Sequence, residues 1–176
     1  MDEFAADLKA IKERARRDME RGAVTGNYRG DREAIVRVLN EVLATEVVCT
    51  LRYQRHYYMA AGINSEAIKE EFLQHARQEQ EHADRVATRI VQLNGEPNFN
   101  PEGLASRSHS EYAEGGDLTG MIRADLYAER IAIESYSEIV RWIGDKDPTT
   151  RRLMEDILKT EEEHAEDLKS LLEKHA

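Results

Sequence analysis

Two short stretches of the chain place a glutamate three residues before a histidine. In "EQEHADR" the pair is Glu79 and His82, and in "EEEHAED" it is Glu161 and His164. Residues three apart on an α-helix lie on the same face, so each pair can direct a carboxylate and an imidazole at one point. These groups bind metal ions such as iron and manganese. One such pair is common by chance in a charged chain, but two copies indicate a metal site.

Two further glutamates fall within apolar stripes of helical periodicity. Glu46 lies one turn after Leu43, and Glu129 lies one turn after Leu126. A carboxylate buried without a partner costs several kcal/mol, and four that converge repel one another unless cations lie among them. Two divalent cations balance four carboxylates, and neutral imidazoles complete the ligand sets. The pattern therefore predicts a two-metal site formed by Glu46, Glu79, His82, Glu129, Glu161 and His164.

The two halves of the chain repeat this arrangement. Glu46 and Glu79 are 33 residues apart, and Glu129 and Glu161 are 32 residues apart. One Glu from each of two helices, with Glu-x-x-His from the other two, is the ligand pattern of di-iron and di-manganese carboxylate bundles. The repeat indicates two similar metal positions related by a pseudo-twofold axis. The neighbouring acids point elsewhere around their helices and are expected on solvated faces: Glu81, Glu162 and Glu163.

Four long helical patterns must position these ligands. They span about residues 31–62, 65–95, 117–144 and 147 onward. Short connections within the first and the last pair predict antiparallel hairpins, whereas the segment 95–117 is long enough to run the length of a bundle. The expected fold is all-α: a four-helix bundle over residues 31–176 with a long crossover between its second and third helices. This is the ferritin-like arrangement.

Residues 1–30 are interpreted as a separate N-terminal extension that is largely helical. Its apolar stripe consists of Phe4, Leu8, Ile11, Ala15 and Met19. The stripe is one residue wide, so the helix is marginal alone and is expected to dock on the bundle or on a neighbouring subunit. Seven Lys and Arg against six Asp and Glu make the segment too weakly basic for a DNA-binding arm.

The composition opposes several classes of protein. The 176 residues include 25 Lys and Arg against 35 Asp and Glu, a formal net charge of −10. This charge attracts cations and opposes the coating of DNA phosphates. No apolar run approaches the roughly 20 residues of a membrane span, and the N-terminus lacks the apolar core of a secretory signal. One cysteine cannot form an internal disulfide, so we expect a cytoplasmic protein without a membrane partner.

Four stretches resemble the bacterioferritin branch of the ferritin-like superfamily. They are "LATEVVCTLRY" (43–53), "QEQEHADR" (78–85), "MIRADLYAER" (121–130) and "ILKTEEEHAEDL" (157–168). The resemblance covers about residues 31–173. It implies a centre of two iron ions, and the same ligand types suit manganese as well.

The resemblance also implies a role for each candidate residue. Glu79 and Glu161 bridge the two ions, Glu46 and His82 hold one iron, and Glu129 and His164 hold the other. The same resemblance implies that Tyr53, seven residues after Glu46, lies beside the site. Gln80 stands where bacterioferritins carry a haem-ligating methionine, so haem is not expected.

The long crossover and the N-terminal extension are closer to the Dps-like mini-ferritins, which form 12-subunit cages with a bacterioferritin-type site. The resemblance therefore implies a homo-oligomer, with 12 subunits favoured over 24. Some of these proteins have a cysteine pair near the metals. This chain has only Cys49, one turn after Glu46, where a buried core residue is expected.

The expected function is iron oxidation and storage. The site binds Fe²⁺ and passes its electrons to O₂ or H₂O₂, and the ferric product collects inside a cage. The alternative is a di-iron or di-manganese peroxidase or catalase that stores no mineral. A cage that coats DNA would need a basic surface, which the net charge opposes. His75, four residues before Glu79, is either an iron-entry or auxiliary ligand or a partly exposed polar residue.

Overall fold

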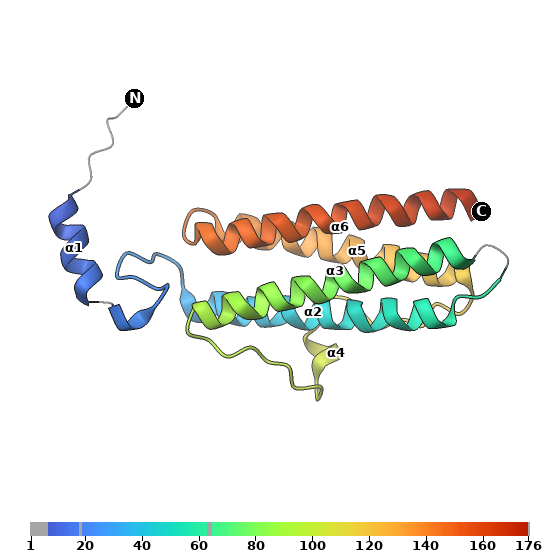
Figure 1. The fold of residues 1–176 in the computed structure, drawn as a ribbon, viewed down its shortest axis with the longest axis horizontal. Coiled ribbons are helices and arrows are strands. Elements are labelled where there is room, and N and C mark those ends of the chain that lie inside the picture. Colours follow the sequence, from blue (N-terminus) through green and yellow to red (C-terminus); the bar gives the residue numbers. More distant parts are fainter. Residues whose placement is uncertain (1–6, 18, 63–64, 176) are drawn as a thin grey trace, which may run out of the picture.

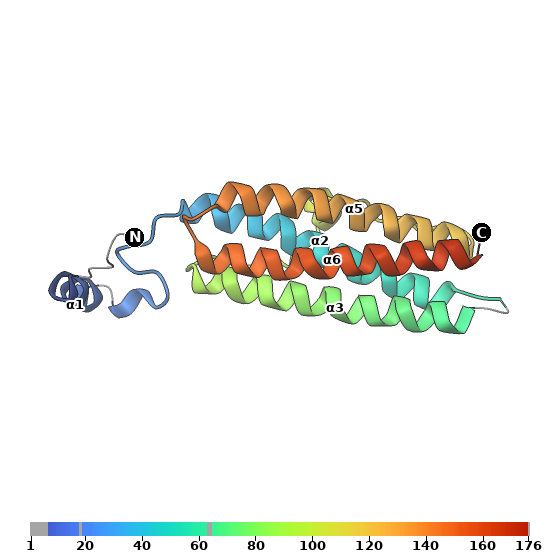
Figure 2. The ribbon, with the colours of Figure 1, turned by 90° about the horizontal axis from the view of Figure 1, so that it is seen from above.

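The computed structural model describes residues 7–17, 19–62 and 65–175, and its main body is a bundle of long helices (Figure 1). These helices are α2 (Arg32–Met59), α3 (Ser65–Gln92), α5 (Leu118–Ile143) and α6 (Pro148–His175). Helices α2 and α6 run in one direction, and α3 and α5 run in the other (Figures 1 and 2). The described residues contain no strand. The predicted all-α, ferritin-like bundle with its long crossover is confirmed.

Aspartate side chains cap the beginnings of three of the bundle helices. Asp31 accepts a hydrogen bond from the backbone N–H of Ala34 at 3.1 Å, and Asp117 accepts one from Gly120 at 2.7 Å. Asp147 accepts one from the backbone N–H of Thr150 at 2.9 Å, at the beginning of α6, whose first residue is a proline. Helix α2 ends at Met59, earlier than the expected residue 62. Helix α3 begins at Ser65, as expected.

Two apolar clusters fill the bundle at either side of its middle. One contains Ile35, Leu39, Val86, Ile90, Tyr136, Met154 and Ile157 among others, and the other contains Tyr53, Ile68, Phe72, Met121, Ile122 and Leu168 among others. All these side chains are at most 3% exposed. Since both clusters are built from the predicted helical stripes, the apolar residues set how the four helices face one another.

The crossover lies along α2 and contains a short helix, α4 (Leu104–Arg107), that the sequence did not suggest (Figure 1). Arg52 and His56 of α2 hold the crossover in place after α4. They donate hydrogen bonds to the backbone carbonyl oxygens of Glu111 and Ala113, at 3.3 and 3.1 Å respectively. Both side chains also pair with Asp125 of α5, at 2.8 and 2.7 Å. Because Arg52, His56 and Asp125 are fully buried, these hydrogen bonds are shielded from water.

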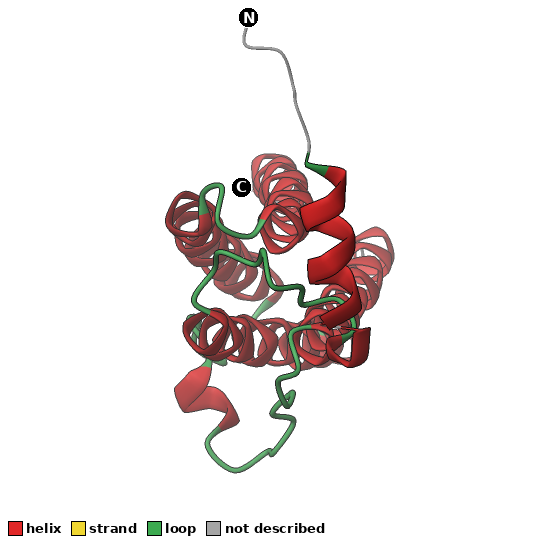
Figure 3. Ribbon diagram, turned by 90° about the vertical axis from the view of Figure 1, so that its left-hand side faces the viewer, coloured by secondary structure: helices red, strands yellow, loops and turns green. Residues whose placement is uncertain are grey.

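The N-terminal segment is only partly joined to the bundle. Helix α1 (Leu8–Arg17) contains no buried residue. It lies beyond one end of the long helices (Figures 1 and 2), and the view onto that end shows it in front of them (Figure 3). It is followed by the short 3₁₀ helix η1 (Met19–Arg21). Further along, Val24 and Tyr28 pack against the first apolar cluster. The expected docking of the α1 stripe on the bundle is therefore wrong for its described residues; docking on a neighbouring subunit stays a prediction, and Phe4 lies outside the described residues.

Among the described residues, no helix combines the length and the apolar character that crossing a membrane requires.

Replacing Asp125 with Asn should destabilise the fold strongly. The change leaves the buried Arg52 without its counter-charge, which costs about 3–5 kcal/mol of unfolding free energy. Denaturant unfolding at a fixed chain concentration measures this loss. Glu114→Gln is the matched control, because it removes an exposed ion pair with Arg55 on the same crossover and should cost less than about 1 kcal/mol. Equal losses for the two variants would contradict the assigned role of Asp125.

Candidate metal centre

Each bundle helix contributes at least one ionisable side chain to the polar layer between the two apolar clusters. The layer contains Glu46 of α2, Glu79 and His82 of α3, Glu129 of α5, and Glu161 and His164 of α6. All six are at most 3% exposed. The three-residue spacing of each Glu–His pair places both side chains on the inner face of its helix. The structure thus brings together all six residues that the sequence singled out as ligands.

These six residues form two overlapping groups. In the first, Glu46, Glu79, His82 and Glu161 each have one potential ligand atom within 4.8 Å of the others. In the second, the same holds for Glu79, Glu129, Glu161 and His164. Because only Glu79 and Glu161 occur in both groups, they are the residues whose two oxygens could serve two cations at once. This geometry agrees with the bridging role implied by the sequence resemblance.

Several ligand atoms in this layer lack hydrogen bonds. Both carboxylate oxygens of Glu161, one oxygen each of Glu79 and Glu129, and Nδ1 of His164 are buried without a hydrogen-bond partner in the described part of the chain. Buried polar atoms are normally paired, so such a concentration needs a reason. His164 Nδ1 lies 3.1 Å from Glu79 Oε1 and 3.3 Å from Glu161 Oε2. Bound cations would satisfy these atoms, and the donor set therefore fits a pair of divalent metal ions.

Burial and neighbouring charges determine where protons lie in the metal-free centre. Burial and the charge of Glu79 raise the pKa of Glu46 to about 8. Burial, with the charges of Glu79 and Glu161, raises the pKa of Glu129 well above its ordinary value. Burial opposes the charge of His164, but its contacts with Glu161 and Glu79 outweigh this and raise its pKa to about 11. These shifts favour the protonated forms of Glu46, Glu129 and His164 in the metal-free centre.

The other three ligands complete a neutral set. Burial opposes the charge of His82, yet contacts with Glu161 and then Glu46 raise its pKa. Burial also raises the pKa of Glu79 and Glu161, but their contacts with the two histidines outweigh it, so the pKa of each is lowered. Two ionised carboxylates thus face two charged imidazoles. Two divalent cations that replace the four protons would leave the total charge unchanged.

Two tyrosines connect the halves of the centre. Tyr53 of α2 donates its hydroxyl hydrogen to Glu129 of α5, and Tyr136 of α5 donates to Glu46 of α2. Tyr53 was expected beside the site. Tyr136 is a residue of the site that the sequence did not single out, although it follows Glu129 by the same seven residues that separate Tyr53 from Glu46. Extending the internal repeat by two turns would have identified it.

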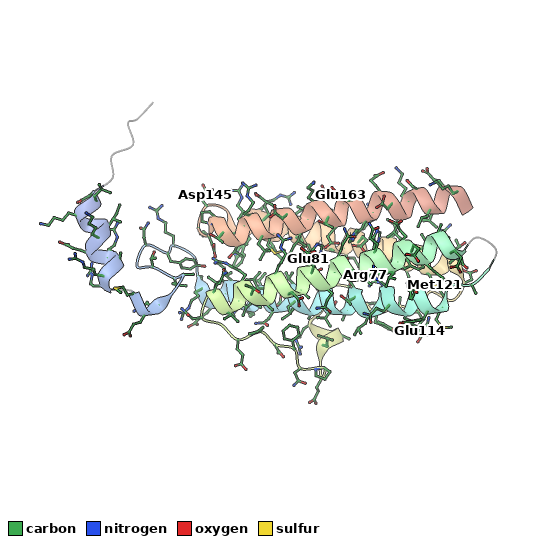
Figure 4. The ribbon with its side chains drawn as sticks, viewed as in Figure 1. Arg77, Glu81, Glu114, Met121, Asp145 and Glu163 are labelled. Atoms are coloured by element: carbon green, nitrogen blue, oxygen red, sulfur yellow. The ribbon has the colours of Figure 1, made fainter. Side chains whose placement is uncertain are left out.

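Other side chains surround the candidate ligands. Gln78 accepts a hydrogen bond from His164 Nε2 at 3.1 Å, which leaves Nδ1 toward the carboxylates. Cys49 is buried as expected. The acids expected on solvated faces are exposed: Glu81, Glu162 and Glu163. Figure 4 shows Glu163 on the side of α6 that faces away from α3.

The chain is similar to known proteins over most of its length. The family model described as the ferritin-like domain matches residues 36–176 of the chain. The chain belongs to the ferritin-like family. A bacterioferritin of Desulfovibrio desulfuricans is 29% identical to it over 142 residues, which are 80% of this chain and 75% of the relative. A DNA protection during starvation protein of Pyrococcus furiosus is 33% identical over 138 residues, 76% of this chain and 74% of that protein.

Solved structures of ferritin-like proteins have the same architecture. A dodecameric thioferritin, the bacterioferritin-related protein of Bacteroides fragilis, matches with a TM-score of 0.80 and 29% identity, over 83% of this chain and 88% of that one. Dps of Thermosynechococcus elongatus matches with a TM-score of 0.76 over 80% and 90% of the two chains, and at 20% identity it supports the fold alone. The resemblance to bacterioferritins and Dps-like proteins is confirmed, and the role of each ligand stays a prediction.

Metal binding should release protons from this centre. At neutral pH, Zn²⁺ should displace roughly four protons per chain, because the cations and the protons occupy the same atoms. For the same reason the affinity for Zn²⁺ should rise with pH. Titration calorimetry in two buffers of different ionisation enthalpy counts the protons. His82→Gln should release about one proton fewer, and Glu162→Gln, an exposed control, should match the unaltered protein. Binding of Zn²⁺ without proton release would contradict the assigned protonation.

Proposed function

We propose that this chain is a ferroxidase that oxidises Fe²⁺ at the paired site and stores the ferric product. The observation that carries the proposal is the overlap of the two ligand groups at Glu79 and Glu161. That overlap provides two adjacent metal positions of similar chemistry. Each Fe²⁺ donates one electron and the oxidant accepts two, so two adjacent ions can reduce one oxidant molecule. Membership of the ferritin-like family supports the same function.

The proposed reaction uses two Fe²⁺ as substrate. Glu46 and His82 hold one ion, Glu129 and His164 hold the other, and Glu79 and Glu161 bridge them. Each Fe²⁺ loses one electron. When H₂O₂ is the oxidant it accepts both electrons, its O–O bond breaks, and two protons complete two water molecules. When O₂ is the oxidant it accepts both electrons and two protons and leaves as H₂O₂.

The chain's own residues supply orientation and proton control. The hydroxyls of Tyr53 and Tyr136 each donate a hydrogen bond to one oxygen of Glu129 and Glu46 respectively, and this restricts rotation of these carboxyl groups. Protons that leave the ligands when Fe²⁺ enters are available to the reduced oxidant. The apolar clusters on both sides limit the access of water to the layer.

A cage is the proposed setting for storage. The related structure from Bacteroides fragilis is described as dodecameric, which supports 12 subunits over 24 for this chain. Some relatives carry names that refer to DNA, but the net charge of −10 opposes binding of phosphates. We therefore propose a cytoplasmic cage that takes up cations rather than one that coats DNA.

Removing a ligand should abolish fast iron oxidation. We expect Glu161→Ala and His82→Ala to lose the rapid rise of ferric absorbance after Fe²⁺ is mixed with O₂ or H₂O₂, because each variant disrupts at least one metal position. Stopped-flow absorbance measures the loss. Glu162→Ala is the control, since it changes an exposed neighbour of Glu161 and should oxidise Fe²⁺ at the original rate. Ligand variants that keep the original rate would contradict the site assignment.

The solution mass should distinguish the storage cage from a smaller peroxidase or catalase. Chains of 20.2 kDa give about 240 kDa for a 12-subunit cage and about 480 kDa for 24 subunits. We expect the lower of these values in light scattering at physiological salt. A dimer or hexamer that turns over H₂O₂ without accumulating ferric mineral would instead support the peroxidase or catalase alternative.

A further inference from the structure

His75 is a buried histidine that the proposed reaction does not use. It lies on α3, one turn before Glu79, and its side chain is 0% exposed. Its ring stacks on that of the candidate ligand His164, with 3.9 Å between the ring centroids and 23° between the planes. The alternative of a partly exposed polar residue is therefore wrong. A histidine buried beside a metal centre needs partners for both ring nitrogens.

The hydrogen-bond network defines which nitrogen of His75 carries the hydrogen. Tyr53 donates its only hydroxyl hydrogen to Glu129, so toward His75 it can act only as an acceptor. His75 Nδ1, at 3.2 Å from the Tyr53 oxygen, must then be the donor. Burial favours the neutral ring, and a neutral imidazole with its hydrogen on Nδ1 has a lone pair on Nε2.

That lone pair faces two acidic side chains. His75 Nε2 lies 3.2 Å from Glu71 Oε1 and 3.8 Å from Asp167 Oδ2. It is buried and has no hydrogen-bond partner within the described chain. A lone pair and two carboxylates that face one another repel unless a cation lies among them. One atom from each of the three residues lies within 4.8 Å of the others, close enough to contact a single ion.

We infer that Glu71, His75 and Asp167 form a third divalent-cation site that adjoins the paired site and opens to solvent. Two carboxylates balance the charge of one divalent ion, and a mixed oxygen and nitrogen donor set suits Fe²⁺, Mn²⁺ or Zn²⁺. The side chains of Glu71 and Asp167 are 29% and 53% exposed, so water can complete the ligand set and an ion can enter from outside.

The internal repeat gives this site no counterpart in the other half of the bundle. The residues at the equivalent positions, counted from Glu161 and His82, are Leu153, Ile157 and Arg85. Ile157 belongs to the first apolar cluster, and Arg85 forms an ion pair with Asp156. The third site is therefore a feature of one side only, and it is not a by-product of the duplicated ligand pattern.

The position of the site indicates a role as a loading position for the paired site. Its acids reach solvent, and its histidine contacts His164 of the paired site. Negative charge at an entrance raises the local concentration of cations. This role rests on the proposed ferroxidase function, whereas the existence of the site does not.

Anomalous diffraction from Zn²⁺-soaked crystals tests the site itself. Zn²⁺ is the probe because it undergoes no redox chemistry. We expect the unaltered protein to show peaks at the paired site and a further peak among Glu71, His75 and Asp167. The double variant Glu71→Gln/Asp167→Asn should lose only the further peak. The matched control Glu70→Gln/Glu173→Gln removes two exposed charges from the same helices and should keep all the peaks.

Each outcome of this experiment is decisive. The absence of the further peak in the unaltered protein when the paired site is filled, or its persistence in the Glu71→Gln/Asp167→Asn variant, would overturn the third site. Zn²⁺ at the third site with the paired positions empty would instead contradict the proposed function and support the third site. Peaks at the paired site in the double variant would show that the variant is folded.

The loading role has a separate test. At Fe²⁺ concentrations below saturation, the initial oxidation rate of Glu71→Gln/Asp167→Asn should fall about tenfold, the lower end of the range for electrostatic concentration of a counter-ion. Glu70→Gln/Glu173→Gln should retain the original rate. If the two double variants oxidise subsaturating Fe²⁺ equally fast, the loading role is wrong, whatever the diffraction result.

Discussion

The burial of four carboxylates in one dry layer is the constraint on which the rest of this bundle depends. Each of the long helices must present a glutamate inward at the same height, because a carboxylate left alone in the core costs several kcal/mol. Two imidazoles and four protons can balance the layer, and two divalent cations can take their place. The helices are thus held in register by a charge requirement that apolar packing alone does not impose.

The apolar clusters and the tyrosines make this layer specific. The clusters lie on both sides of it and keep it away from bulk water, which strengthens every electrostatic interaction inside. Tyr53 and Tyr136 then cross between the hairpins, and each donates to the glutamate of the other half. The pseudo-twofold relation therefore extends beyond the ligands to the groups that orient them. It ends at His75, where one half carries a polar, solvent-linked cluster and the other half carries apolar packing.

The crossover shows a second use of buried charge. Arg52, His56 and Asp125 join α2 to α5 and also hold backbone carbonyls of the connecting segment. Asp125 lies one turn before Glu129 on α5, so the residues that fix the crossover also fix the helix that carries a candidate ligand. A long connection without strands can follow this path because α2 supplies the donors that its backbone needs.

The sequence by itself determined the four helices, the crossover and the six inward-facing candidate ligands, because helical periodicity and three-residue spacing are local properties. It also contained the signal for Tyr136, in a repeat that extends two turns beyond the glutamates. Only the tertiary structure decided which residues meet across helices. In the sequence, Asp125 has no feature that distinguishes it from other helical residues, and only the structure shows its contacts with Arg52 and His56. In the same way, Glu71 and Asp167 resemble solvated acids in the sequence, and only the structure places His75 between them. The contacts of Asp125 with Arg52 and of Asp167 with His75 join residues about 70 to 100 positions apart, and no periodicity along one helix encodes them.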